Sequence, residues 1–78
     1  MARVLLLGPA REAAGTGRDD VEGDTLASVL DEAARRYGEE FRSILAVSQV
    51  WVNGQPASPL TPLAPYDEVA VLPPVSGG

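Results

Sequence analysis

The sequence predicts an α+β fold in which one main helix crosses one face of a mixed sheet of four to five strands. Three features support this fold: a β-compatible run at residues 2–8, a second run at residues 67–72, and a helical pattern between them. The length of 78 residues is that of one domain. We expect residues 1–72 to form this domain and residues 73–78 to form an extended tail.

The N-terminal third is expected to contain two strands. Residues 2–8 carry a run of aliphatic side chains, which a Gly-Pro pair then ends. Residues 10–14 have the composition of one helical turn, and Gly15 stops it. Residues 18–21 are a weaker strand candidate because they are mostly polar.

The central helix is the strongest element of the sequence. Asp24 or Thr25 can cap its first turn by accepting a hydrogen bond from a backbone N–H that has no partner in the helix. Gly38 is a natural stop. Between cap and stop, one apolar stripe follows the helical repeat; its members are Leu26, Val29, Leu30, Ala33 and Tyr37.

Charged side chains on this helix have the spacing of ion pairs. Asp31 with Arg35, and Glu32 with Arg36, stand four residues apart, and each pair would stabilise the helix by about 0.2–0.5 kcal/mol. After the stop, a second short helix is expected at residues 39–45, with three inward side chains: Phe41, Ile44 and Leu45.

The C-terminal half is expected to add two strands. Residues 48–52 form the first, and the Asn-Gly pair after them predicts a tight turn. Residues 56–65 carry a proline at every third position. We interpret them as a stiff loop that places Leu60 and Leu63 against the core, and not as a proline-rich ligand motif. With residues 67–72 as the last strand, the arrangement is the β-grasp, or ubiquitin-like, fold.

The end of the chain is expected to leave the sheet. Two successive prolines offer no N–H to a strand ladder and favour an extended backbone, and six extended residues reach roughly 20 Å. Two glycines without side chains would let the tail enter a narrow cleft. The six residues are Pro73, Pro74, Val75, Ser76, Gly77 and Gly78.

Composition limits the chemistry that this chain can perform by itself. It lacks His, Cys and Lys, which supply most general bases, nucleophiles and soft metal ligands. We therefore expect no bound cofactor, no metal site and no catalysis by the chain alone. The net charge of −5 opposes binding to nucleic acid or to anionic membranes. Without a recognisable signal peptide or membrane-spanning run, the expected location is cytoplasmic.

Chemistry on the chain, at the Gly78 carboxylate, is the remaining expectation. A partner that uses ATP can convert this carboxylate to an acyl adenylate. A sulfur donor can then displace AMP and leave a thiocarboxylate. A side chain at the last position would crowd both attacks, so Gly77 and Gly78 are the predicted reactive end.

The ending from Asp67 to Gly78 resembles the small subunit of molybdopterin synthase, the MoaD-type sulfur carrier. Residues 11–15 and 52–54 are similar to the turns of that family. The resemblance implies three partners: an E1-like adenylating enzyme, a sulfur donor enzyme and the large subunit of molybdopterin synthase. Family members commonly have glycine where Tyr66 stands, so a turn with positive φ would be strained there.

Strand parity predicts a second functional feature, an exposed apolar patch for docking partners. If Val4 faces the helix, alternation places its neighbours on the opposite side of the sheet, and the same argument applies to the other central strands. The predicted patch consists of Leu5, Leu7, Trp51, Ala70 and Leu72. Together with Pro73, Pro74, Val75 and Ser76, these residues are the expected partner contacts.

Acidic residues are interpreted mainly as a solvated surface. Two of them, Asp67 and Glu68, lie in the last strand region and are candidates for pairing with a partner's arginine. The solvated set comprises Asp19, Asp20, Glu22, Glu39 and Glu40.

Three alternatives share parts of this interpretation. The chain could carry sulfur for thiamine thiazole or cysteine biosynthesis. It could be a ubiquitin-like modifier, although a chain without lysine cannot build lysine-linked chains on itself. It could also be a plain β-grasp binding module, for example for RNA, but its acidic charge argues against that.

Overall fold

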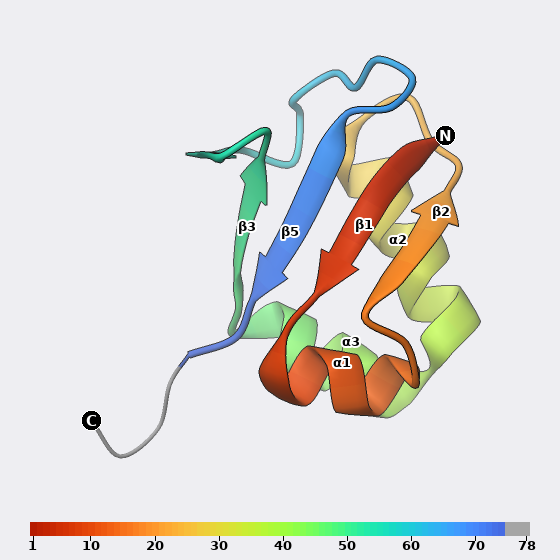
Figure 1. Cartoon of the computed structure of the whole chain (residues 1–78), viewed down its shortest axis with the longest axis vertical. Helices are drawn as coiled ribbons and strands as arrows, with labels where there is room; N and C mark the ends of the chain where they lie inside the picture. Colours follow the sequence, from red (N-terminus) through yellow and green to blue (C-terminus); the bar gives the residue numbers. More distant parts are fainter. Residues whose placement is uncertain (75–78) are drawn as a thin grey trace.

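The computed structural model describes residues 1–74, which form a five-stranded mixed sheet and three helices (Figure 1). The elements in chain order are β1 (Ala2–Leu6), α1 (Gly8–Ala14), β2 (Arg18–Val21), α2 (Leu26–Tyr37), α3 (Glu39–Ala46), β3 (Gln49–Val52), β4 (Gln55–Pro56) and β5 (Glu68–Leu72).

The strands lie in the order β2-β1-β5-β3-β4. β1 and β5 run parallel at the centre, and the other neighbouring strands are antiparallel. Helix α2 lies behind the sheet in Figure 1, and α1 and α3 lie near the end where β1 and β5 finish. The predicted α+β fold is confirmed, and both short helices are present.

Helix α2 begins where the sequence predicts. Thr25 accepts a hydrogen bond from the Ser28 N–H, and the Ser28 hydroxyl accepts one from the Thr25 N–H, so the two residues cap the helix reciprocally. Gly23 precedes this cap with φ of 153°, and a Cβ there would lie 2.8 Å from the Val29 nitrogen. A side chain at residue 23 is therefore incompatible with the observed helix start.

The proline-rich loop packs differently from the prediction. The first N–H groups of a helix have no partner inside it, and the loop satisfies two of them: Leu26 donates to the Thr61 carbonyl and Ala27 to the Pro59 carbonyl. With these carbonyls turned toward the helix, Leu60 points outward and is 84% exposed. Leu63 packs against the core as expected, but the prediction for Leu60 was wrong.

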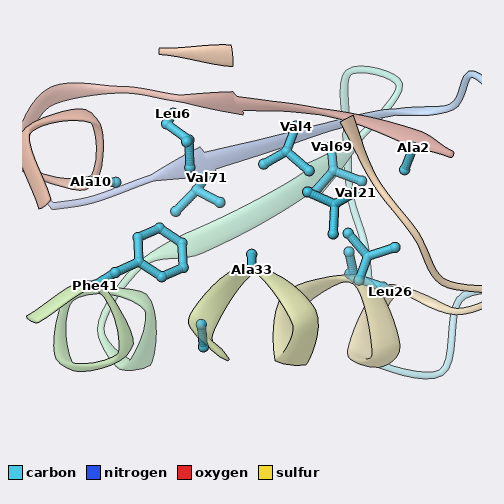
Figure 2. Packing of buried hydrophobic residues seen from close by; sticks show 12 residues of the cluster. Ala2, Val4, Leu6, Ala10, Val21, Leu26, Ala33, Phe41, Val69 and Val71 are labelled. Carbon is cyan, nitrogen blue, oxygen red and sulfur yellow. The ribbon is translucent and has the colours of Figure 1, made fainter. Parts of the chain in front are cut away.

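The core lies between the sheet and the helices (Figure 2). Phe41 rises from α3 toward Val71, and its ring meets Tyr37 edge-to-face at a centroid distance of 5.1 Å. No polar or charged side chain among residues 1–74 is buried. The buried residues are Ala2, Val4, Leu6, Ala10, Val21, Leu26, Val29, Ala33, Ala34, Phe41, Val69 and Val71.

A polar cluster joins β2 to α2 and corrects two predictions. Asp19 is not simply solvated: its carboxylate accepts hydrogen bonds from the Tyr37 hydroxyl at 2.5 Å and from Arg36 at 3.0 Å. The Tyr37 hydrogen bond, helped by Arg36, holds the pKa of Asp19 below its ordinary value. Arg35 pairs with Glu32 and not with Asp31.

Glu32 also forms an ion pair with Arg36, as the four-residue spacing predicted. Arg36 thus bridges two carboxylates, one on its own helix and one on β2. The cluster fixes the last turn of α2 against the outer strand of the sheet.

Candidate docking face and tail root

The central strands place three of the predicted contact residues in one row. Ala70 of β5 is the register partner of Leu5 in β1 and of Trp51 in β3. The row continues to Arg18 on β2 and to Pro56 on β4. No helix of residues 1–74 crosses this side of the sheet in Figure 1. We call this side the open face.

Burial separates the two sides of β1 and β5. Val4, Val69 and Val71 are fully buried on the helix side, whereas Leu5 and Ala70 are half-buried on the open face. β3 does not show this contrast, because Val50, Trp51 and Val52 are all half-buried. β3 lies toward the edge of the sheet that is away from α2 in Figure 1, so the helix covers its inward-facing side chains less.

The open face changes character along the strands. At the start of β5 it is charged, because Glu68 is the register partner of Arg3, which in turn is the partner of Asp20. At the end of β5 it is uncharged and mainly apolar: Leu72 lies beside the polar Gln49, and Leu7, directly after β1, is 47% exposed. The apolar end is the one from which the tail continues.

A side-chain clasp holds the start of β5. The Asp67 carboxylate accepts a hydrogen bond from the Ala64 N–H at 2.7 Å and one from the Asn53 amide at 3.1 Å. The Ala64 bond first, and then the Asn53 bond, hold the pKa of Asp67 below its ordinary value. Asp67 is therefore engaged within the chain, while Glu68 is exposed and forms none of the ion pairs within residues 1–74.

Tyr66 has a positive φ, although the sequence left the geometry of this turn open because related carriers commonly have glycine at this position. Its φ is 72°, its N–H donates to the Met1 carbonyl, and its side chain is 86% exposed. For a residue with a Cβ this conformation costs about 1–2 kcal/mol. The turn before β5 is therefore closed at the expense of local backbone strain.

The alternation of side chains along the strands did not predict one exposed apolar residue near the start of the tail. Val47 follows α3 and is 66% exposed. It lines a groove of about 420 Å³ with the root of the tail; the other lining residues are Gln49, Leu72, Pro73 and Pro74. Val47 lies between a helix and a strand, where neither the helical nor the strand repeat assigns a side chain to a face. We call this hollow the tail-root groove.

Of the predicted tail contacts, Pro73 is half-buried and Pro74 is exposed. Val75, Ser76, Gly77 and Gly78 lie outside the described residues. Within residues 1–74, none of the helices has the length and apolar character needed to span a membrane.

Comparisons with known proteins agree on the fold. The crystal structure of small archaeal modifier protein 1 from Haloferax volcanii is 31% identical, with a TM-score of 0.84 over 99% of this chain and 98% of that chain. A Pyrococcus furiosus protein described as molybdopterin converting factor subunit 1 is 26% identical, with a TM-score of 0.84 over 95% of this chain and 97% of its own.

A third similar structure is a complex. Subunits 1 and 2 of the molybdopterin-converting factor from Helicobacter pylori were solved together, and the matched chain is 26% identical, with a TM-score of 0.72 over 99% of this chain and 97% of that one. Curated protein sequences give no significant match. The model of the ThiS family matches residues 4–78. Since this match covers nearly the whole sequence, the chain belongs to the ThiS family, whose fold is that of the ubiquitin-like sulfur carriers.

Proposed function

We propose that this protein is a sulfur carrier that serves as the small subunit of a molybdopterin synthase. The main support is the family match, which runs through Gly77 and Gly78. The similarity to molybdopterin converting factor subunit 1 favours this pathway. The apolar end of the open face, next to the root of the tail, gives a partner a surface on which to hold the domain while it acts on the terminus.

The proposed loading takes place in two steps at Gly78. A carboxylate oxygen attacks the α-phosphorus of ATP in the E1-like enzyme, so that pyrophosphate leaves and a glycyl adenylate forms. A sulfide-level sulfur from the donor enzyme then attacks the glycyl carbonyl carbon, and AMP leaves. The product is a thiocarboxylate, which the large synthase subunit uses as its sulfur source.

The chain's own residues position this reactive end. Leu72 is the last residue paired in the sheet, and Pro73 and Pro74 cannot extend the ladder because they have no N–H. The β5–β3 ladder therefore ends at a fixed point, directly before the two prolines. Activation comes from the partners, since the chain contributes no His, Cys or Lys.

Intact mass spectrometry tests this function directly. The chain is incubated with the E1-like enzyme, ATP and a sulfur donor, and the expected product has one terminal oxygen replaced by sulfur. A variant that lacks Gly78 is the control and should stay unchanged. A full-length chain that never gains sulfur, although the E1-like enzyme is active on another carrier, contradicts the proposal.

The pathway is tested with the loaded protein. Incubation with the large synthase subunit and the pterin precursor should consume the thiocarboxylate and yield the dithiolene product. Consumption only by a thiazole synthase or by a cysteine-forming enzyme would assign the chain to one of those pathways.

Protein modification is the second candidate, and the 31% identity to a small archaeal modifier protein favours it. The same glycyl adenylate would then be attacked by a lysine amine of a target protein, with AMP as the leaving group. Conjugates that survive denaturation and thiol treatment would support this role. Since the chain contains no lysine, each conjugate should carry single copies attached to target lysines and no lysine-linked chains.

A further inference from the structure

The tail-root groove is built from elements that hold their positions. Gln49 and Leu72 are register partners at the ends of β3 and β5. Val47 is held by its N–H bond to the Ile44 carbonyl, and the next residue, Ser48, donates from both its N–H and its hydroxyl to the last turn of α3. Two prolines form the remaining wall. The groove therefore exists before any partner binds.

The lining determines what the groove can accept. Four of its five residues are aliphatic or proline, and none is charged. The remaining residue, Gln49, already accepts a hydrogen bond from the Trp51 indole at 3.3 Å. For comparison, an apolar cavity of about 150 Å³ holds a benzene molecule. The open groove of about 420 Å³ thus has room for an aliphatic side chain, and its lining has no charged side chain that could pair with a charged one.

The position of the groove indicates that an enzyme acting on Gly78 supplies that side chain. Pro73 and Pro74 are at once its wall and the first residues of the tail. An enzyme that draws Gly78 into a narrow active site must enclose these prolines with the rim of its entrance. The rim then lies over the groove, and a rim residue is the nearest group that can fill it.

We propose that the tail-root groove receives an aliphatic side chain from the rim of the E1-like adenylating enzyme, with Val47 as a specificity-determining contact. This inference rests on the proposed function and extends it. The hydrogen bond between Gln49 and Trp51 links the groove to the row of Leu5, Ala70 and Trp51. The docking surface therefore continues from the open face to the end of α3.

Two variants of Val47 test the groove, with Leu60 as the matched control. Val47→Asp places a charge in the apolar lining, and Val47→Ser removes apolar surface with less risk to the fold. Leu60→Asp introduces the same charge at another exposed aliphatic residue, in the loop beside the start of α2. Binding to the purified adenylating enzyme is measured by titration calorimetry, and adenylation is measured by ATP–pyrophosphate exchange.

We expect Val47→Asp to weaken binding and raise the KM for the carrier at least tenfold, with a smaller effect of Val47→Ser. The kcat should not change, because Gly78 is intact, and Leu60→Asp should match the wild type. If both Val47 variants are folded in thermal melts and bind the enzyme as tightly as the wild type, the proposal for the groove is overturned. If the wild type binds but is not adenylated, the proposed function fails, and the Val47 binding data still decide the groove.

Discussion

The two sides of the same sheet differ in what covers them. On β1 and β5, Val4, Leu6, Val69 and Val71 are sealed under the helices, whereas Leu5 and Ala70, one residue away, face the open side. Both sets are apolar, so hydrophobicity alone does not tell them apart. The helix side stabilises the domain, and the open side carries the apolar surface that we propose for partner docking. Substitutions on the two sides should therefore affect different measurements.

The largest expected effect is on the helix side, at Phe41. Phe41→Ala removes a fully buried ring and its contact with Tyr37, which should cost about 3–5 kcal/mol. A chain of this size has a total stability of roughly 4–12 kcal/mol, so the variant should be partly or wholly unfolded in chemical denaturation. Leu60→Ala, on a loop residue that is 84% exposed, should stay within about 0.5 kcal/mol of the wild type.

Trp51→Arg tests the open face. The substitution should weaken binding to the large synthase subunit at least tenfold, because central aromatic anchors contribute about 2 kcal/mol or more at such interfaces. The thermal melt should remain close to that of the wild type. Leu60→Arg introduces the same charge on the proline-rich loop and should bind normally. Equal affinities of the wild type, Trp51→Arg and Leu60→Arg would contradict a docking role for the open face.

Asp19→Asn sharpens the comparison at the outer strand, where polar bonds and not apolar contacts hold β2 to α2. The loss should be about 0.5–1 kcal/mol at pH 7, since the site is partly exposed. The pKa of Asp19 is lowered in the folded state, so its stabilisation is full above the ordinary value of 3.8 and disappears as the pH falls through the folded value. Urea denaturation from pH 7 to pH 2 should show the two proteins converging in acid.

The control for this series is Asp20→Asn. Arg36 contacts the backbone carbonyl of Asp20 and not its carboxylate, so this variant should keep the wild-type stability at pH 7. A gap between wild type and Asp19→Asn that persists at pH 2 would mean that the carboxylate charge is not its source.

Tyr66→Gly, in the turn before β5, has the smallest expected effect because a gain and a loss in stability oppose each other. Glycine relieves the left-handed strain of about 1–2 kcal/mol but loses about 0.5–1 kcal/mol through its greater freedom in the unfolded chain. The two ranges leave a net gain of about 0–1.5 kcal/mol in urea denaturation. Tyr66→Ala keeps a Cβ and should show no gain, and partner affinity should be unchanged in both variants.

The sequence predicted most of the helices and strands because caps, stops and side-chain alternation depend only on neighbouring residues. The Thr25 cap, the Gly38 stop and the alternation in β1 and β5 depend on residues within a few positions of each other. The glycine common at the place of Tyr66 in related carriers raised the question of a strained turn, but only the structure shows the positive φ there.

Apart from the local pairing of Arg35 with Glu32, the errors came from contacts between distant segments. Leu60 turns outward because its loop supplies carbonyls to the start of α2, more than thirty residues earlier. Asp19 meets Arg36 and Tyr37 only after β2 and α2 have packed together. The tail-root groove likewise joins residues from a helix end, two strand ends and the tail. None of these juxtapositions leaves a periodic signal in the sequence.

Trp51 gives the protein a built-in optical reporter. It is the only tryptophan of the chain, and its indole is half-buried on the open face with its N–H held by Gln49. A partner that covers this face would remove water from the ring and change its fluorescence emission. With a partner that lacks tryptophan, or one whose tryptophan fluorescence is shifted by labelling, the rates of binding and dissociation can be measured with unlabelled carrier.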